Sequence, residues 1–564
     1  MKITQNKLLL LLFGLLLASC STRENHHKGP LLAVVGEQKI TADEFVTRYR
    51  DFRERTGQGV PDTYSARRKV LSQMVEEEIL IDEARRRGFD RDATGKHQLA
   101  SIRMQHLLSA YNHEFIAKRV VVTEEELKQL YVRANTRLRA RHLYAPTREQ
   151  AERLYAALKQ GASFEALAKK VFHDPRLRDS GGLLGDFTVD EMEPTFEDAA
   201  FRLKVGEISK PVRTTDGYSI IRVDSRVTKP LLTETDYAKH KQKLEAYWRY
   251  RKSLKAAAAF SDSLARSLHI SFNEPLVARL FQSARAQVAE NGAPTEGDFL
   301  APFDTEKEEV LVSSDLGAWT VELFQQKATF TSPAHRKWIR SREQLKEFIS
   351  GLVVRDKILA LAQNAGLART TDFAEKVQES WENYLLSRME NELRSEMVVP
   401  EDSLRSYYDA NKDLFAQPAK IRLREIVLDR EAQADSVKQM LRQGRAFQAL
   451  ARKFSVRRWS AEKGGDLGYL EPADLGKWSQ MIFTMQAGEI RGPLKMDGKL
   501  VFLKCEDKLP PKPRSYTAAR SDVEKAVRFI MWDDYRRARI KEFRKNLAVT
   551  VHAEKLKQIN LNDY

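Results

Sequence analysis

The fold is decided by the stretch Gly-Gly-Leu-Leu-Gly-Asp-Phe at Gly181–Phe187, because a second copy, Gly-Gly-Asp-Leu-Gly-Tyr, follows at Gly464–Tyr469. The two stretches lie 283 residues apart (464 − 181). Other landmarks recur in the same order at nearly the same distance, as when Thr41–Phe45 returns at Thr320–Phe324, 279 residues on (320 − 41). A period this long indicates repeated domains and excludes a solenoid of short repeats.

The first residues predict an export signal. Lys2 and Lys7 precede an apolar run, Leu8–Leu17, which is shorter than the roughly 20 residues that a membrane span needs. The run ends in Leu-Ala-Ser-Cys, which resembles the bacterial lipobox and implies cleavage before Cys20 with a lipid on its thiol. Ser21 resembles the residue found in lipoproteins sent to the outer membrane. The alternative is an ordinary signal peptide with a chance cysteine.

Composition limits the class of protein. The chain has 564 residues, 42% of them hydrophobic, which is enough for several buried cores. If Cys20 carries a lipid, only Cys505 remains and no intramolecular disulfide can form. The net charge of +16 favours an anionic membrane surface or acidic polypeptides, or is a solvated surface on long helices. A basic run with interleaved aromatic residues is missing from the sequence, which argues against nucleic acid.

Hydrophobic periodicity predicts helices joined to mixed segments. The expected helices share apolar positions three and four residues apart and cover about 41–49, 66–87, 95–120, 124–135, 234–268 and 516–547. Each of the last two has an apolar stripe that must pack on the helices preceding the mixed segment. Each copy is therefore expected to be a helical body with an inserted α/β domain, and the sequence Asn-Gly-Ala-Pro at Asn291–Pro294 marks the joint between copies.

The mixed segment from Arg137 to Val227 resembles a parvulin-type peptidyl-prolyl isomerase domain. The matching residues occur in family order: Arg141–Leu143, Gly161–Ala168, Gly181–Phe187, Met192, Phe196–Phe201, Val205–Ser209 and Pro211–Val212. The segment Lys420–Lys508 resembles the family more weakly, through Gly444–Phe447, Gly464–Tyr469 and Ala487–Ile490. The helical bodies are similar to the chaperone regions of SurA-, PrsA- and PpiD-type periplasmic foldases.

The expected fold is therefore a multidomain α+β protein. It is a tandem duplication of a helical chaperone body, and each copy carries an inserted parvulin domain built from a small antiparallel sheet and helices. The expected segments are a signal peptide (1–20), a tether (21–30), a first helical body (31–135, completed by 229–280), a first parvulin-like domain (136–228), a linker (281–308), a second helical body (309–417, completed by 510–564) and a degenerate second parvulin-like domain (418–509).

The resemblance implies a site in the first parvulin-like domain. The proline pocket would be formed by Leu184, Phe187, Met192 and Phe196. The family has two facing histidines beneath this pocket and a Cys or Asp near the substrate carbonyl. His142 matches one histidine, Ser219 replaces the other, and Asp174 lies beside the Cys/Asp position. The alternatives are that His142 satisfies a core hydrogen bond and that Asp174 caps a loop.

The second parvulin-like domain departs further from the family. Glu425 and Leu500 stand in for the two histidines, and Arg457 and Arg458 occupy the loop of the Cys/Asp residue. We expect this domain to catalyse nothing. It can still present a peptide groove, and the residues expected to line it are Leu467, Tyr469 and Trp478.

Three functions are consistent with these residues. The first is a lipid-anchored periplasmic chaperone for unfolded outer-membrane or secreted polypeptides, with residual isomerase activity in the first parvulin-like domain. The second is a fully active isomerase, and the third is a non-catalytic accessory lipoprotein of an outer-membrane assembly machine. Rotation about an X–Pro bond has a barrier of about 18–20 kcal/mol and needs no metal or cofactor, and none is expected here. The scattered histidines lack metal-ligand spacing.

Overall fold

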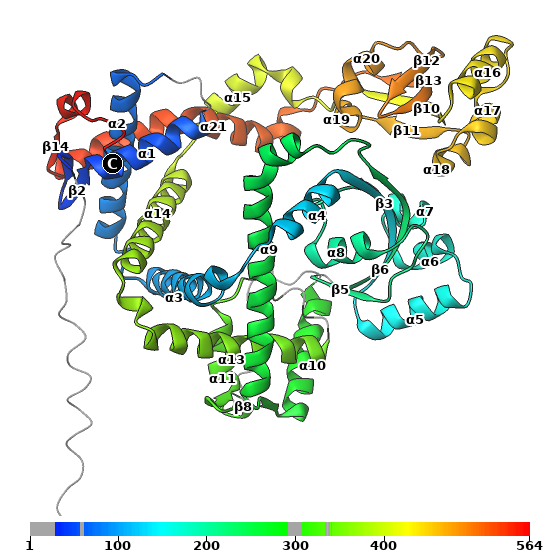
Figure 1. Ribbon diagram of the computed structural model, residues 1–564. Coiled ribbons are helices and arrows are strands. Elements are labelled where there is room, and N and C mark those ends of the chain that lie inside the picture. Colours follow the sequence, from blue (N-terminus) through cyan, green and yellow to red (C-terminus); the bar gives the residue numbers. More distant parts are fainter. Residues whose placement is uncertain are drawn as a thin grey trace, which may run out of the picture. The chain divides into compact units, whose positions relative to one another are not determined.

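The computed structural model describes residues 29–56, 61–215, 217–291, 307–332, 336, 339 and 341–563, without the side chains of 283–291 (Figure 1). The expected signal peptide, Cys20 and almost all of the tether lie outside these residues. The chain divides into two compact units. Unit 1 comprises residues up to Ala100, Gln378–Asn411 and Tyr516–Tyr564, and unit 2 comprises Ser101–Val377 and Lys412–Ser515.

Unit 1 combines a three-stranded sheet with long helices. The sheet is antiparallel in the order β14-β1-β2. The elements of unit 1 are β1 (Leu31–Val35), β2 (Gln38–Thr41), α1 (Ala42–Arg55), α2 (Tyr64–Arg86), α14 (Thr371–Glu396, which begins in unit 2), α15 (Glu401–Ala410), α21 (Tyr516–Phe543) and β14 (Val549–Val551). A capping box closes the start of α1, with Thr41 and Glu44 as partners. The predicted helix at 66–87 is confirmed as α2.

Unit 2 contains a second helical body with its own sheet. The sheet has the order β7-β8-β9. The elements are α3 (Ala93–Phe115, which begins in unit 1), α4 (Glu124–Ala134), α9 (Glu234–Ser267), β7 (Ser271–Phe272), α10 (Glu274–Asn291), β8 (Val310–Ser314), β9 (Gly317–Thr320), α11 (Val321–Ala328) and α13 (Arg342–Asn364). One buried cluster, with Leu276, Phe324 and Ile349 among its members, forms the core of this body. Part of the expected linker at 281–308 is helical, since α10 continues to Asn291.

The two sequence copies exchange strands. β1 of the first copy pairs with β14 of the second, with Ala33 opposite Val551, and β7 of the first copy pairs with β8 of the second. Helices are shared too: Arg536 on α21 contacts Glu76 on α2 and Glu390 on α14, at 3.0 and 2.9 Å. The sequence predicted that 229–280 complete the first body and 510–564 the second, and it did not indicate these pairings between copies. Because both copies carry the same strand pattern, each strand can pair equally well with the other copy's partner, as in domain swapping.

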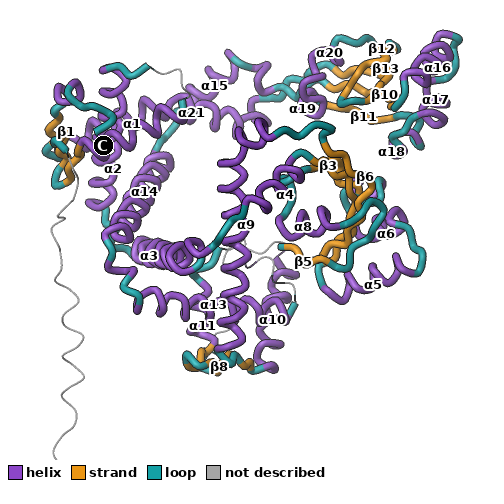
Figure 2. The backbone as a smooth tube through the Cα atoms, viewed as in Figure 1, coloured by secondary structure: helices purple, strands orange, loops and turns teal. Residues whose placement is uncertain are grey.

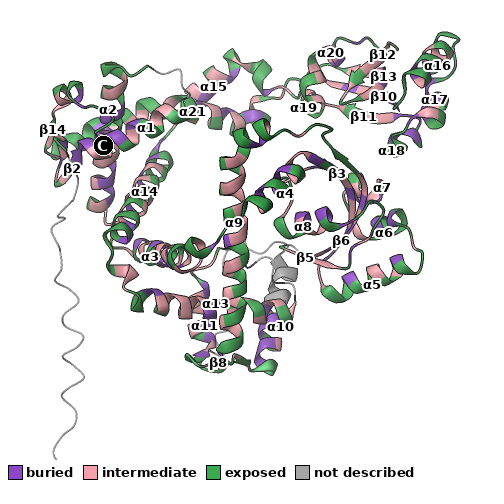
Figure 3. Ribbon diagram, viewed as in Figure 1, coloured by how far each residue is buried: buried purple, intermediate pink, exposed green. Residues whose placement is uncertain are grey.

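The first parvulin-like domain is a four-stranded antiparallel sheet covered by short helices, as Figure 2 shows. The strand order is β4-β3-β6-β5. Its elements are β3 (Thr136–Ala145), α5 (Arg148–Lys159), α6 (Phe164–Val171), α7 (Pro175–Asp179), β4 (Leu183–Phe187), α8 (Pro194–Arg202), β5 (Val212–Thr214) and β6 (Gly217–Thr228). Buried residues alternate along β3 and β6, so one face of the sheet packs under α8 and the other under α5 and α6 (Figure 3).

The second parvulin-like domain repeats this order as β11-β10-β13-β12. Its elements are β10 (Lys420–Leu428), α16 (Glu431–Arg442), α17 (Phe447–Phe454), α18 (Arg458–Ala461), β11 (Asp466–Leu470), α19 (Pro472–Leu475), α20 (Ser479–Phe483), β12 (Ile490–Met496) and β13 (Lys499–Leu509). The expected α+β fold class is confirmed. Within the described residues, every helix is too short or too polar to cross a membrane.

Candidate functional site

His142 and Ser219 meet on the central strands of the first parvulin-like domain. His142 lies on β3 opposite Ile221, and Ser219 lies on β6 opposite Tyr144, so the two side chains are diagonal neighbours on one face. The Nδ1 atom of His142 is 3.3 Å from the Oγ atom of Ser219. The serine is almost completely buried. Ser219, which was expected to replace the second histidine of the family, is therefore a hydrogen-bond partner of His142.

Aromatic rings enclose His142 on its other sides. The ring of Phe172 is 5.2 Å away, and the ring of Phe196 meets it edge-on at 5.8 Å. Burial lowers the pKa of His142 to about 4, because little water remains to solvate the charged ring. The imidazole is therefore neutral at pH 7, with one nitrogen as donor and one as acceptor.

The expected pocket residues surround this pair at different depths. Phe187 and Phe196 retain only 3% and 5% of their surface exposed, so both rings belong to the domain core. Leu184 and Met192 are half-buried and pack against the same cluster. The structure thus brings the four expected pocket residues together, with the two aliphatic side chains nearer the surface.

The repeated glycine motif is explained by a close approach of two backbone segments. Gly182 has φ +76°, and a Cβ atom there would lie 2.0 Å from the carbonyl oxygen of His142. The His142 amide also donates to the Gly182 carbonyl at 2.9 Å. Gly465 lies in the same way against Glu425, where a Cβ atom would be 2.3 Å from the carbonyl oxygen. Only glycine fits at these two positions.

Asp174 caps a helix. Its carboxylate accepts a hydrogen bond from the Arg176 amide at 2.8 Å, at the start of α7, and this bond lowers the pKa of Asp174. The Arg176 guanidinium lies 3.4 Å from the same carboxylate. These contacts match the capping alternative. They do not join Asp174 to His142.

The second parvulin-like domain has a buried carboxylate, paired with a partly exposed arginine, where the first has His142. Glu425 keeps 2% of its surface exposed. Its carboxylate accepts from Arg457 Nη1 at 2.7 Å and from Ser460 Oγ at 2.6 Å. The sequence singled out Glu425 and Arg457 but missed Ser460. The signal that could have found Ser460 is its position three residues after Arg457, one turn along the same short helix.

The strand register corrects the second histidine position in this domain. Ser219 lies opposite Val212, and the corresponding pair in the second domain is Val501 opposite Leu494. Val501, and not Leu500 as expected, therefore corresponds to Ser219 in the strand register. Leu500 points to the opposite face of the sheet, because neighbouring strand residues alternate.

The expected groove residues of the second domain are only partly open to solvent. Leu467 and Trp478 are half-buried and pack against the domain core. The Trp478 Nε1 atom is buried and has no hydrogen-bond partner within the described residues. Tyr469 is exposed, and its hydroxyl donates to Asp507. These residues offer apolar surface with few polar contacts.

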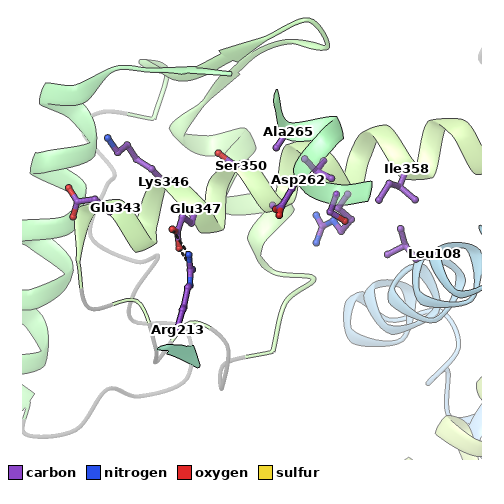
Figure 4. A pocket seen from close by; sticks show the side chains of 13 residues that line it. Leu108, Arg213, Asp262, Ala265, Glu343, Lys346, Glu347, Ser350 and Ile358 are labelled. Atoms are coloured by element: carbon purple, nitrogen blue, oxygen red, sulfur yellow. Dashed lines mark hydrogen bonds and ion pairs between the residues drawn. The ribbon is translucent and has the colours of Figure 1, made fainter. Parts of the chain in front are cut away.

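A separate cavity of about 720 Å³ lies in unit 2, and its lining residues do not include the expected proline-pocket residues (Figure 4). It is lined mainly by α9 and α13, with Arg213 from β5 at its edge. Figure 4 shows Arg213 pointing at Glu347, and the two side chains are 2.6 Å apart. The cavity carries charges of both signs. The described residues contain no group of three His, Cys, Asp or Glu side chains that could hold a metal ion.

Comparison with known proteins identifies relatives of three parts of the chain. Residues 139–225 and 399–521 match family models described as PPIC-type PPIASE domain, and residues 5–106 match a SurA-like N-terminal domain. The foldase protein PrsA of Caldanaerobacter subterraneus subsp. tengcongensis is 31% identical over 253 residues, which are 40% of this chain and 82% of that protein.

The foldase protein PrsA of Geobacillus kaustophilus is 34% identical over 202 residues, covering 35% of this chain and 70% of that protein. Among solved structures, a PpiC-type peptidyl-prolyl cis-trans isomerase domain is 29% identical, with 16% of this chain and 94% of that domain covered and a TM-score of 0.16.

Proposed function

We propose a function from the family to which this chain belongs, that of PrsA-type foldases with PPIC-type peptidyl-prolyl isomerase domains. In this proposal the protein is a chaperone whose first parvulin-like domain retains weak isomerase activity. Its clients would be unfolded polypeptides. The single observation that carries the proposal is the His142, Ser219 and Phe196 cluster, which persists in the first domain and is replaced by an ion pair in the second.

The cluster supports catalysis by desolvation. A planar X–Pro amide loses its resonance as it twists, so an apolar pocket that excludes water favours the twisted form. Leu184 and Met192 would hold the proline ring from above, with the Phe196 ring as the wall behind them. The neutral His142, held by Ser219, would supply a polar edge without placing a charge beneath the substrate.

The second parvulin-like domain would bind and not catalyse. The Glu425 carboxylate is paired with the Arg457 guanidinium and accepts a hydrogen bond from Ser460, so its oxygens are not available to a twisting amide. Leu467, Tyr469 and Trp478 would contact an extended client segment. Two such domains and two helical bodies would bind one client by several weak contacts, which raises avidity without any tight site.

The chain would act outside the cytoplasm. The first residues support export, and Cys20 would carry the lipid that holds the protein on the periplasmic face of the outer membrane. Outer-membrane polypeptides would then be the nearest clients. Extraction with detergent and mass spectrometry of the N-terminal peptide test the anchor: a diacylglyceryl cysteine is expected, and an unmodified N-terminus cut elsewhere would exclude it.

Two assays on the full chain without its lipid test the proposal. The first follows cis/trans exchange of a short proline peptide by NMR for wild type, His142→Ala and Phe196→Ala. We expect modest acceleration by wild type and at least a tenfold loss in both variants. The second follows aggregation of an unfolded outer-membrane protein, which all three should suppress equally. No acceleration by wild type would remove the isomerase claim, and no suppression would remove the chaperone claim.

A further inference from the structure

A buried ion pair joins the first parvulin-like domain to the helical body of unit 2. Glu197 on α8 and Arg251 on α9 are 3.0 Å apart, and their side chains keep only 5% and 8% of their surface exposed. The Tyr247 hydroxyl accepts a hydrogen bond from Arg251 at 2.6 Å and lies 3.4 Å from Glu197. The buried pair and the half-buried Tyr247, from two elements, therefore satisfy one another. A buried charge without its partner is strongly destabilising, so these contacts hold the two elements in one geometry.

The same network holds both segments that carry the pocket. The second carboxylate oxygen of Glu197 accepts from the Asp190 amide at 2.6 Å, two residues before Met192. Asp190 has φ +68°, a conformation that a residue with a side chain rarely adopts without support. Arg251 also donates to the Pro194 carbonyl at 3.0 Å, two residues before Phe196. A change at Arg251 would therefore displace both Met192 and Phe196.

The second copy lacks this network. Tyr237 on α9 corresponds to Tyr516 on α21, since each meets a tyrosine of the preceding short helix edge-on. The same spacing of 279 residues (516 − 237) places Ile530 at the position of Arg251, and Ile530 is exposed. Ser479 stands at the position of Glu197, next to Trp478. The copy that contains His142 is thus also the copy that contains the Glu197–Arg251 ion pair.

We propose that Arg251, although it belongs to the helical body, is a positioning residue for the proline pocket of the first parvulin-like domain. Through Glu197 and the Pro194 carbonyl it fixes α8 and the loop before it, and so sets where Phe196 and Met192 stand. Arg251 touches no substrate itself. This inference rests on the proposed isomerase function of that domain, and it means that the pocket is complete only when the domain is seated on α9.

Arg251→Met in the full chain tests the inference, because methionine keeps much of the side-chain length and removes every donor. The matched control is Arg213→Met, which breaks the exposed Arg213–Glu347 pair between the same domain and helix α13 without touching α8. Glu197→Gln is a second way to break the network if Arg251→Met fails to fold. The readouts are KM and kcat for a proline peptide, and the ¹³C-methyl NMR signal of Met192.

We expect Arg251→Met and Glu197→Gln to raise KM about tenfold with kcat changed less than threefold, because the pocket wall is displaced while His142 is untouched. Arg251→Lys, which retains one donor group, should give an intermediate KM. Arg213→Met should stay within twofold of wild type. The Met192 signal should move in the first two variants and not in the control.

Equal KM values in Arg251→Met and Arg213→Met would overturn the inference, as would an unmoved Met192 signal. If wild type shows no isomerase activity, the proposed function fails on its own. The Met192 signal of the peptide-free protein still decides whether Arg251 positions the pocket, so the two failures are distinguishable.

Discussion

The two parvulin-like domains share a backbone and differ in what lies beneath the pocket. Both have the same strand order, and both bring a glycine against the strand at the same point, Gly182 against His142 and Gly465 against Glu425. The first domain places a neutral histidine among phenylalanines there, and the second places a carboxylate among polar partners. The requirement of the fold has therefore been kept in both domains. The first domain alone keeps a histidine at this point.

The largest effect is expected where the backbone leaves no room. Gly182→Ala should cost more than about 3 kcal/mol of stability in the first domain, because its Cβ atom would overlap the His142 carbonyl. Gly185→Ala is the matched control: Gly185 has φ +91° and nothing near its Cβ position, so only about 1 kcal/mol of backbone strain applies. Hydrogen exchange of the β3 amides measures both. Similar losses of stability in the two variants would show that the close approach of Gly182 to the His142 carbonyl does not explain the glycine motif.

Breaking the ion pair between Glu425 and Arg457 should lower the stability of the second parvulin-like domain only. Arg457→Met leaves the Glu425 carboxylate buried with Ser460 alone and should cost about 2 kcal/mol, since the Arg457 side chain itself is partly exposed. Replacing both, as Glu425→Leu with Arg457→Met, should restore most of that loss, because two apolar side chains leave no uncompensated charge. Hydrogen exchange along β10 and β13 gives the comparison. A double variant that is less stable than Arg457→Met would mean that the ion pair itself stabilises the domain.

Acid should weaken the first domain through His142. Its pKa is about 4 in the folded chain and near 6.5 when unfolded, so the unfolded state binds the proton more tightly. The stability is fully present above pH 6.5 and falls as the pH drops toward 4, with a loss of about 2 kcal/mol by pH 5. His142→Gln should flatten this dependence in β3 exchange measured from pH 7 to 5. An unchanged slope would show that other groups cause it.

The smallest effect is expected at Ser219. Ser219→Ala removes the hydroxyl partner of His142 and should cost about 1 kcal/mol, with a fall of about threefold in kcat/KM. The corresponding change in the second domain, Val501→Thr, should leave isomerase activity unaltered. A loss at Ser219 as large as that of His142→Ala would make the hydroxyl a full member of the catalytic group.

Much of the architecture could be predicted from the sequence because it rests on local patterns. The periodicity of 66–87 and 124–135 predicted α2 and α4, and the glycine motif predicted both mixed domains. The pairing of β1 and β7 with strands of the other copy could not be predicted. Because the duplicated strands have similar sequences, the sequence does not show which of them pair. Pairing across copies is decided by tertiary contacts such as those of Arg536.

The candidate site was predicted unevenly for the same reason. His142 and Ser219 could be placed from the family pattern, and the structure brings them within hydrogen-bond distance. Leu500 was predicted in place of Val501, one residue too early, because Gly217 is part of β6 whereas Gly498 precedes β13. Ser460, Glu197 and Arg251 were missed. Glu197 and Arg251 pair across elements distant in sequence, which no spacing rule reveals, whereas the spacing of Ser460 from Arg457 could have indicated it.

The most direct test of the central claim is catalysed exchange of a proline peptide, measured by NMR on full-length chains that each lack one of the two contrasting groups. The account predicts that exchange persists in the Glu425→Leu, Arg457→Met double variant and disappears in His142→Ala. Exchange that survives in His142→Ala and is lost in the double variant would contradict it.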